Sequence, residues 1–306
     1  HFGLLSFGNS DGGQFGGIGA MIDRPGLQLR IADADHFVAS GPHAARVGEY
    51  VKRFSRYHGR DDADCRIEVI SAPAEHVGLG TGTQLGLSVI AGLSKYFGWK
   101  TPTPAELAAA AGRGFRSSIG THGFCGGGLI YEEVKPDDAI VAPLQDRTTV
   151  PEHWRWLLLR PRFEVGLCGQ AEKDAFSALR SVPRETTERL RDEICKYMLP
   201  AIKTHDFDAF SESLYRYGVA AGKCFAARQS GPFASARLAK LVGAIRHLGV
   251  RGVGQSSWGP TIFALCSSTA ATFELRQQLA QHAAAADTEA FVSSPNNDGA
   301  KIVAES

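Results

Sequence analysis

This chain lacks most of the features that identify disulfide-rich, metal-binding and membrane proteins. Its six cysteines are scattered, with no CxxC pair and no paired His/Cys spacing, which suits reduced thiols in a cytoplasm better than a disulfide framework or a zinc site. Its longest apolar runs, such as WLLL at 156–159, are far too short to span a bilayer, and no charged-then-apolar leader is seen. We therefore expect a cytoplasmic protein without a membrane partner.

An excess of charge of either sign is also missing. The 33 basic and 32 acidic residues almost cancel, so no overall field attracts nucleic acid, and any anion site must be local. The 306 residues are enough for two cores of modest size, which we take as the expected arrangement. A polar stretch interrupted by prolines, at 136–153, marks the expected boundary between domains 1–150 and 151–306.

Common catalytic motifs are missing as well. The chain has no HExxH zinc motif and no GxSxG nucleophile motif. No GxGxxG follows a strand with an acidic residue about twenty positions further on, which argues against a dinucleotide site. The glycine-rich segments of this chain therefore need another explanation.

The spacing of apolar residues predicts strands and helices that alternate along the chain. Strands are expected at 2–7, 27–33, 65–73, 129–134, 156–160, 261–266 and 288–294. Helices are expected at 43–57, after the glycines at 78–83, at 103–112, around Leu190 and Phe210, at 238–248 and at 270–284. The sequence TPAE at 103–106 is typical of a capping box with proline at the first helical position. The glycine-rich stretch 10–23 is expected to be a turn or a ligand loop, and the whole order indicates an α+β fold.

The segment GLGTGT, residues 78–83, stands directly before a predicted helix. Gly78, Gly80 and Gly82 permit positive φ and let backbone amides approach a ligand closely. The N–H groups at a helix start bind phosphate, and the hydroxyls of Thr81 and Thr83 would add donors or, at Thr81, a magnesium ligand. The segment is not a Walker A loop, because no GKS or GKT closes it. A phosphate site and a plain flexible turn both remain open.

A second glycine-rich loop, at 249–260, precedes the strand predicted at 261–266. Gly254, Gln255, Ser256 and Ser257 place small polar groups on a flexible backbone, which suits a second wall around the same anion. A simple connection between a helix and a strand explains the same residues, so the loop alone does not decide.

Three further side chains are candidates for chemistry. Asp23 follows a glycine-rich stretch and would accept a hydrogen bond from a substrate, or simply cap the turn before Pro25. Arg116, ahead of Arg113, would hold a phosphate or a carboxylate with paired N–H donors. His122 lies among glycines and is either an acid or base or a structural histidine.

The glycine segments, taken in order, resemble the three motifs of the GHMP small-molecule kinase superfamily. The most specific is P-x-x-x-x-GLG-[ST]-x-[ST], at Pro73–Thr83. Six segments in order, including HFGLL, FGGIGAMID, RSSIGTHGF, RPRFEVGLCGQAEKDAF and GVGQSSWGPT, resemble the β-ribofuranosylaminobenzene 5′-phosphate synthase family over almost the whole chain.

The resemblance implies a fold and a reaction. The fold would be a two-domain GHMP-kinase-like one, with an N-terminal domain like ribosomal protein S5 domain 2 and a C-terminal ferredoxin-like domain. The reaction would join 5-phosphoribosyl 1-diphosphate to 4-aminobenzoate, releasing diphosphate and carbon dioxide, in the biosynthesis of methanopterin-type one-carbon cofactors. Mg²⁺ would assist departure of the diphosphate. In that reaction we assign Asp23 to the acceptor amine and Arg116 to its carboxylate.

Two alternatives stay open beside this transferase. An ATP-dependent GHMP kinase normally needs a placed carboxylate or an equivalent group to orient its nucleophile, and residues 107–131 contain no Asp or Glu. A relative that only binds a phosphorylated metabolite would fit the same loops. A homodimer is expected, because soluble enzymes of this size often form twofold pairs.

Overall fold

The computed structural model describes residues 1–8, 13–60, 63–162, 174, 176, 179–229 and 231–304. Cys168 and most of the segment 160–176 that carries part of the family resemblance lie outside these residues. The five other cysteines are free thiols. No helix in the described part of the chain combines the length and the apolar character that a bilayer crossing requires.

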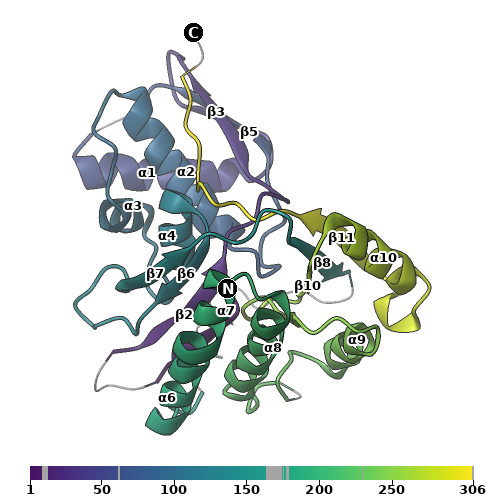
Figure 1. Cartoon of the computed structure of the whole chain (residues 1–306). Coiled ribbons are helices and arrows are strands. Elements are labelled where there is room, and N and C mark those ends of the chain that lie inside the picture. The colour runs from purple at the N-terminus through teal and green to yellow at the C-terminus, as the bar shows by residue number, and fades with distance from the viewer. Residues whose placement is uncertain are drawn as a thin grey trace.

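The elements of the first half follow the order of the predicted ones, with four additions (Figure 1). They are β1 (Gly3–Ser6), β2 (Phe15–Ala20), β3 (Gln28–Ala32), β4 (Val38–Ser40), α1 (Ala44–His58), β5 (Arg66–Ser71), α2 (Thr81–Tyr96), α3 (Pro104–Ala111), α4 (Ile119–Gly126), β6 (Leu129–Glu132) and β7 (Leu144–Thr148). The four additions are β2, β4, α4 and β7.

The second half contributes a sheet and its covering helices. They are β8 (Arg155–Pro161), α6 (Arg184–Asp192), the π-helical turn η1 (Glu193–Met198), α7 (Leu199–Lys203), α8 (Phe207–Lys223), α9 (Ala236–His247), β9 (Val253–Gln255), β10 (Ile262–Cys266), α10 (Thr269–Ala280), the short 3₁₀ turn η2 (Ala283–Ala285) and β11 (Thr288–Ser293).

The first sheet has the order β1-β2-β6-β7 and is antiparallel throughout. Its strand β2 lies within the stretch 10–23, so the turn or ligand loop expected there is wrong for residues 15–20. Glycine allows this strand to form, because a side chain at Gly17 would lie 2.3 Å from the carbonyl oxygen of Gly3 on β1. A bare backbone is therefore what lets β1 and β2 pair.

A smaller three-stranded sheet, in the order β3-β5-β4, packs with α1, α2 and α3 around a core of its own. The capping box predicted at the start of α3 is confirmed, with the backbone N–H of Glu106 donating to the Thr103 hydroxyl and the Glu106 carboxylate accepting from the Thr103 N–H. Helix α4 was not predicted. It packs so closely that a side chain at Gly123 would lie 2.4 Å from Met21.

The second half is built on the antiparallel sheet β11-β8-β10-β9, with α9 and α10 packed against it. This α+β layer agrees with the fold class predicted from the sequence. The short strand β9 is an addition, since the stretch 249–260 was expected to be a loop.

The two halves share one hydrophobic core. Phe2 and Ile18 from the first half pack in the same buried cluster as Trp156, Ile194 and Phe263 from the second. The chain then returns to the first half after β11, as the yellow C-terminal segment in Figure 1 shows. The boundary between domains 1–150 and 151–306 therefore stays a prediction from the sequence.

Candidate functional site

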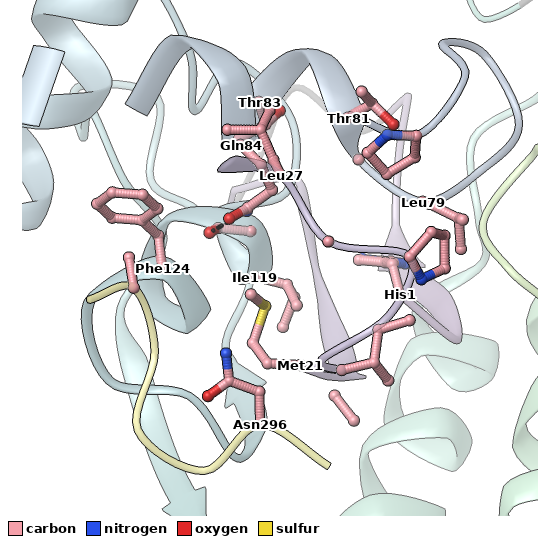
Figure 2. Close-up of a pocket in the computed structure, with 18 of the residues that line it drawn as sticks. His1, Met21, Leu27, Leu79, Thr81, Thr83, Gln84, Ile119, Phe124 and Asn296 are labelled. Carbon is pink, nitrogen blue, oxygen red and sulfur yellow. Dashed lines mark hydrogen bonds between the residues drawn. The ribbon is translucent and has the colours of Figure 1, made fainter. Parts of the chain in front are cut away.

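A broad cavity of about 2130 Å³ opens between segments that lie far apart in the sequence. Its lining includes the loop before α2, the approach to α4, the loop after β9 and the C-terminal segment after β11. Figure 2 shows Thr81, Thr83 and Gln84 from the start of α2 on one side, Ile119 and Phe124 from α4 on another, and Asn296 from the C-terminal segment. Both glycine loops singled out in the sequence reach this cavity.

The loop before α2 turns sharply into the helix. Gly80 is the N-cap residue and has a φ of 70°, in the left-handed region, with open space around the position of a Cβ. The N–H groups of Thr81 and Gly82 come before the first hydrogen bonds of α2, in which the N–H groups of Thr83 and Gln84 donate to the Gly80 carbonyl. Gly78, Gly80, Thr81 and Thr83 line the cavity. The helix start therefore offers the cavity backbone donors and a partial positive charge.

The hydroxyl of Thr81 is used inside the loop. It donates a hydrogen bond to the carbonyl oxygen of Ala74 at 2.9 Å, and only 4% of the residue is exposed. This bond closes the turn and holds the helix start in place. Gly82 faces away from the cavity, where its carbonyl accepts a hydrogen bond from the Tyr50 hydroxyl at 2.7 Å.

The second glycine loop packs directly on the first. The Ser256 hydroxyl donates to the Gly78 carbonyl at 2.8 Å, and a side chain at Gly259 would lie 2.3 Å from the Cα of Gly78. The expectation that both loops belong to one site is in accord with this contact. Gln255 and Ser257 line the cavity, whereas Gly254 is buried in β9 against the ring of Phe263.

A basic cluster stands behind the first loop. The Arg113 guanidinium donates to the Tyr50 hydroxyl and lies over the Tyr50 ring, with 5.6 Å from Cζ to the ring centroid. Arg46 pairs with the Glu75 carboxylate at 2.5 Å. A side chain at Gly82 would lie 3.0 Å from the Arg113 guanidinium, so this positive charge is adjacent to the helix start.

Aromatic rings form another part of the cavity lining. Phe176, Phe225 and Trp258 contact one another, with ring centroids 4.8 Å apart for Phe176–Trp258 and 5.1 Å apart for Phe225–Trp258. The guanidinium of Arg116 lies over the Phe176 ring, 4.4 Å from Cζ to its centroid. We call Phe176, Phe225 and Trp258 the aromatic wall; none of the three was singled out in the sequence.

The two remaining candidates from the sequence have different positions. Asp23 lines the cavity, and its carboxylate accepts a hydrogen bond from the Ser294 N–H at 2.7 Å, which fastens the C-terminal segment. His122 is not part of the cavity lining; it is 5% exposed, and its Nε2 lies 2.8 Å from the Ala142 carbonyl oxygen. Burial lowers the pKa of His122, in keeping with a structural histidine.

A buried carboxylate close to the cavity was missed. Glu132, at the end of β6, is 0% exposed. Its carboxylate accepts hydrogen bonds from the Ser117 hydroxyl at 2.7 Å and from the Ser118 N–H at 2.9 Å. Burial raises the pKa of Glu132 to about 7, and the two serine hydrogen bonds oppose that rise. Ser117 itself lines the cavity, so it connects the cavity with the buried acid.

Comparison with known proteins shows what this chain is similar to. Residues 198–285 match the family described as GHMP kinases C terminal. The chain is 28% identical over 287 residues to the β-ribofuranosylphenol 5′-phosphate synthase of Methanothermobacter thermautotrophicus, covering 87% of this chain and 85% of that protein. It is 29% identical over 288 residues to the synthase of the same name from Archaeoglobus fulgidus, covering 90% of this chain and 87% of that protein.

Solved structures share the fold at low identity. The homoserine kinase of Cytophaga hutchinsonii superposes with a TM-score of 0.61 at 18% identity, covering 94% of this chain and 91% of that one. At that identity the likeness shows the fold alone, so it does not favour the kinase alternative.

The chain therefore has the α+β fold of the GHMP kinase superfamily, as the glycine motifs implied. Over most of its length it is similar to the β-ribofuranosylphenol 5′-phosphate synthases, which agrees with the family resemblance seen in the sequence.

Proposed function

We propose that this chain is a decarboxylating phosphoribosyl-type transferase. It joins the ribosyl phosphate of 5-phosphoribosyl 1-diphosphate to a ring carbon of an aromatic acid and releases diphosphate and carbon dioxide. The observation that carries this proposal is the homology to two synthases over 87% and 90% of the chain. The cavity supports it, because it combines a helix start suited to an anion with a wall suited to an aromatic ring.

The diphosphate is assigned to the start of α2. Thr81 presents the first N–H group of that helix, the Thr83 N–H already donates to the Gly80 carbonyl, and Arg113 stands close behind the helix start. Preorganised donors of this kind stabilise charge that develops on a leaving group, because they need no reorganisation when the bond breaks. Ser256 and Ser257, on the adjoining loop, close the same region of the cavity.

Magnesium is part of this proposal. In the part of the chain that the structure describes, no three His, Cys, Asp or Glu side chains gather as a metal-binding group. A divalent ion would therefore be held mainly by the diphosphate oxygens, with a lone pair of the Thr81 hydroxyl as the protein's contribution. When bound, it would neutralise charge on the departing diphosphate.

The aromatic acid is assigned to the aromatic wall. Stacked or edge-on contacts with Phe176, Phe225 and Trp258 suit a planar ring, and the Arg116 guanidinium offers paired donors to a carboxylate. The resemblance in the sequence points to 4-aminobenzoate, whereas the relatives are named for a phenol product. Both 4-aminobenzoate and 4-hydroxybenzoate therefore belong in the first test.

The chain's own residues have three tasks in such a reaction. The loop and Arg113 hold the diphosphate, the aromatic wall places the ring carbon opposite the ribose carbon, and both shield the developing sugar cation from water. Asp23 is proposed to accept a hydrogen bond from an acceptor amine, although its carboxylate already accepts one from the Ser294 N–H. We propose no acid or base role for His122, since it stands outside the cavity lining.

The decisive experiment supplies 5-phosphoribosyl 1-diphosphate, Mg²⁺ and a carboxyl-labelled acceptor, and measures labelled carbon dioxide together with diphosphate. Equal amounts of both products are expected. Release of ADP from ATP with a small alcohol, and no labelled gas, would favour a kinase. A rise in Tm with the donor but no product would favour a protein that only binds it. A cytoplasmic location, a homodimer and a role in methanopterin-type cofactor biosynthesis complete the proposal.

A further inference from the structure

Ser117 and Glu132 form a pair that the assignment of substrates leaves unused. Ser117 lines the cavity beside Arg116, while Glu132 lies directly behind it with no exposed surface. The Ser117 hydroxyl donates to Glu132 at 2.7 Å and accepts from the Ile119 N–H at 3.1 Å. A hydroxyl oxygen has two lone pairs, so one remains for a group in the cavity.

The pair stands close to the proposed diphosphate loop. Ser117 leads into α4, whose start contacts the start of α2, because the Gln84 side-chain amide donates to the Gly120 carbonyl at 2.9 Å. A side chain at Gly120 would lie 3.2 Å from Thr83. Ser117, Arg116 and Thr83 therefore line neighbouring parts of one cavity, where the acceptor must meet the donor.

Capping of α4 does not by itself explain a glutamate at this position. The carboxylate does accept the Ser118 N–H, but a neutral side chain would cap the helix without placing an ionisable group in a fully buried position. Three charged or titratable groups face Glu132. They are the Lys135 amine, the backbone nitrogen of His1 and the Tyr217 hydroxyl. Lys135 donates to the Gly114 carbonyl at 2.9 Å, and no ion pair with Glu132 forms within the described residues.

We propose that Ser117 and Glu132 relay the proton of an acceptor hydroxyl, which adapts this site to a 4-hydroxy aromatic acid. This inference rests on the proposed transferase function. Ser117 is the residue that contacts the substrate, and Glu132 is a positioning residue that acts through it. An amine acceptor needs no such relay, because its nitrogen lone pair supplies electrons to the ring without loss of a proton.

The chemistry balances over one turnover. The acceptor hydroxyl gives its proton to Ser117 Oγ as Ser117 gives its own proton to Glu132. The ring carbon that bears the carboxylate bonds to the ribose carbon, and diphosphate leaves with the electron pair of the broken C–O bond. Loss of carbon dioxide returns an electron pair to the ring, and the phenolate oxygen takes back the proton through Ser117. Glu132 is then ionised again.

The test compares wild type with Glu132→Gln and Ser117→Ala, using the donor, Mg²⁺ and carboxyl-labelled 4-hydroxybenzoate at several pH values. In wild type, kcat is expected to rise with pH through about 7, the pKa to which burial raises Glu132. Both variants should lose on the order of 100-fold in kcat and lose this pH dependence, with the KM for the donor within about twofold of wild type.

Two further acceptors and one rescue variant separate a relay from a structural role. A ring-fluorinated 4-hydroxybenzoate ionises more readily, so it should recover about tenfold in both variants relative to wild type. Ser117→Thr, which retains a hydroxyl, should recover activity relative to Ser117→Ala. Turnover of 4-aminobenzoate, if wild type shows it, should fall far less than turnover of 4-hydroxybenzoate.

The outcomes also separate the two proposals. If wild type releases neither product, the transferase function fails, and the relay fails with it. If wild type is active and Ser117→Ala keeps the wild-type rate and pH profile, the relay is overturned while the function stands. Equal losses with all acceptors, without a change in pH profile, would also overturn it. Ser117→Ala decides alone if Glu132→Gln does not fold.

Discussion

Replacing Glu132 with glutamine should change how the stability of the protein depends on pH. Glu132 is fully buried, and burial raises the pKa of its carboxyl from an ordinary 4.5 to about 7. Below pH 4.5 the carboxyl is protonated in the folded and the unfolded chain alike. The free energy of unfolding is then not reduced by any cost of ionising the buried carboxyl. Between 4.5 and 7 only the folded chain keeps the proton, so rising pH favours unfolding.

The size of the effect follows from that interval. Each pH unit within it lowers the free energy of unfolding by about 1.4 kcal/mol. Wild type should therefore lose about 3 kcal/mol between pH 4.5 and 7 through this one group. Glutamine cannot ionise, but it is similar in size and its side-chain oxygen still accepts the hydrogen bonds of Ser117 and Ser118. The free energy of unfolding of the variant should therefore not fall over this interval. At pH 8 its Tm should be about 5 °C above that of wild type.

The measurement is a series of urea and thermal unfolding curves at pH 5, 6, 7 and 8 for wild type and Glu132→Gln. The matched control is Glu188→Gln, which replaces a carboxylate on α6 that is 53% exposed and should follow wild type across the series. Parallel curves for wild type and Glu132→Gln from pH 5 to 8 would refute the reasoning, because they would mean that burial does not favour the protonated carboxyl.

Other predictions concern the two loops and the aromatic wall. Gly259→Ala places a methyl group 2.3 Å from the Cα of Gly78, so the free energy of unfolding should fall by about 1–3 kcal/mol in urea, with weaker binding of diphosphate in calorimetry. Gly243→Ala, in α9 with no atom within 4 Å of the added Cβ, should instead raise stability by about 0.5–1 kcal/mol. Thr81→Val removes a loop-closing hydrogen bond and should cost about 1 kcal/mol of diphosphate affinity; unchanged affinity would contradict its role. Trp258→Ala should raise the KM for the aromatic acid about tenfold without affecting the donor, and the reverse pattern would remove it from the acceptor site.

Local signals in the sequence predict much of this fold. The capping box at Thr103 and Glu106 is recognisable because both hydrogen bonds join residues three positions apart. Helix α1 follows regular apolar spacing and strand β10 is a continuous apolar run, and the sequence alone displays both patterns. The sequence also predicts a helix directly after the loop at 78–83, because the glycines of the loop stand abruptly next to residues with helical apolar spacing.

Strand β2 and helix α4 were not predicted for a common reason. Their glycines carry no side chain, so neither a period of two nor a period of 3.6 is visible in the sequence. Gly17 and Gly123 are instead required by close approach of neighbouring chain segments, which depends on tertiary structure.

The burial of Glu132 also depends on tertiary packing, so the sequence alone does not reveal it. Glu132 stands in the sequence YEEV, where an acidic pair is normally solvated, and only the packing of α4 and its approach over β6 encloses it. Glu132 comes directly after residues 107–131, which contain no Asp or Glu. The same kind of packing removed His122 from the cavity lining, although its glycine-rich setting had drawn attention to it.

The return of the C-terminal segment has a consequence for recombining this protein with its relatives. The backbone N–H of Asn296 donates a hydrogen bond to the Met21 carbonyl, and the N–H of Ala300 donates one to the Phe124 carbonyl. Residues after β11 therefore complete a wall of the cavity that otherwise belongs to the first half. A chimaera joined at residue 150 would bring a foreign tail against that wall. To retain a working cavity, such a chimaera should take residues 294–304 from the same parent as residues 1–150.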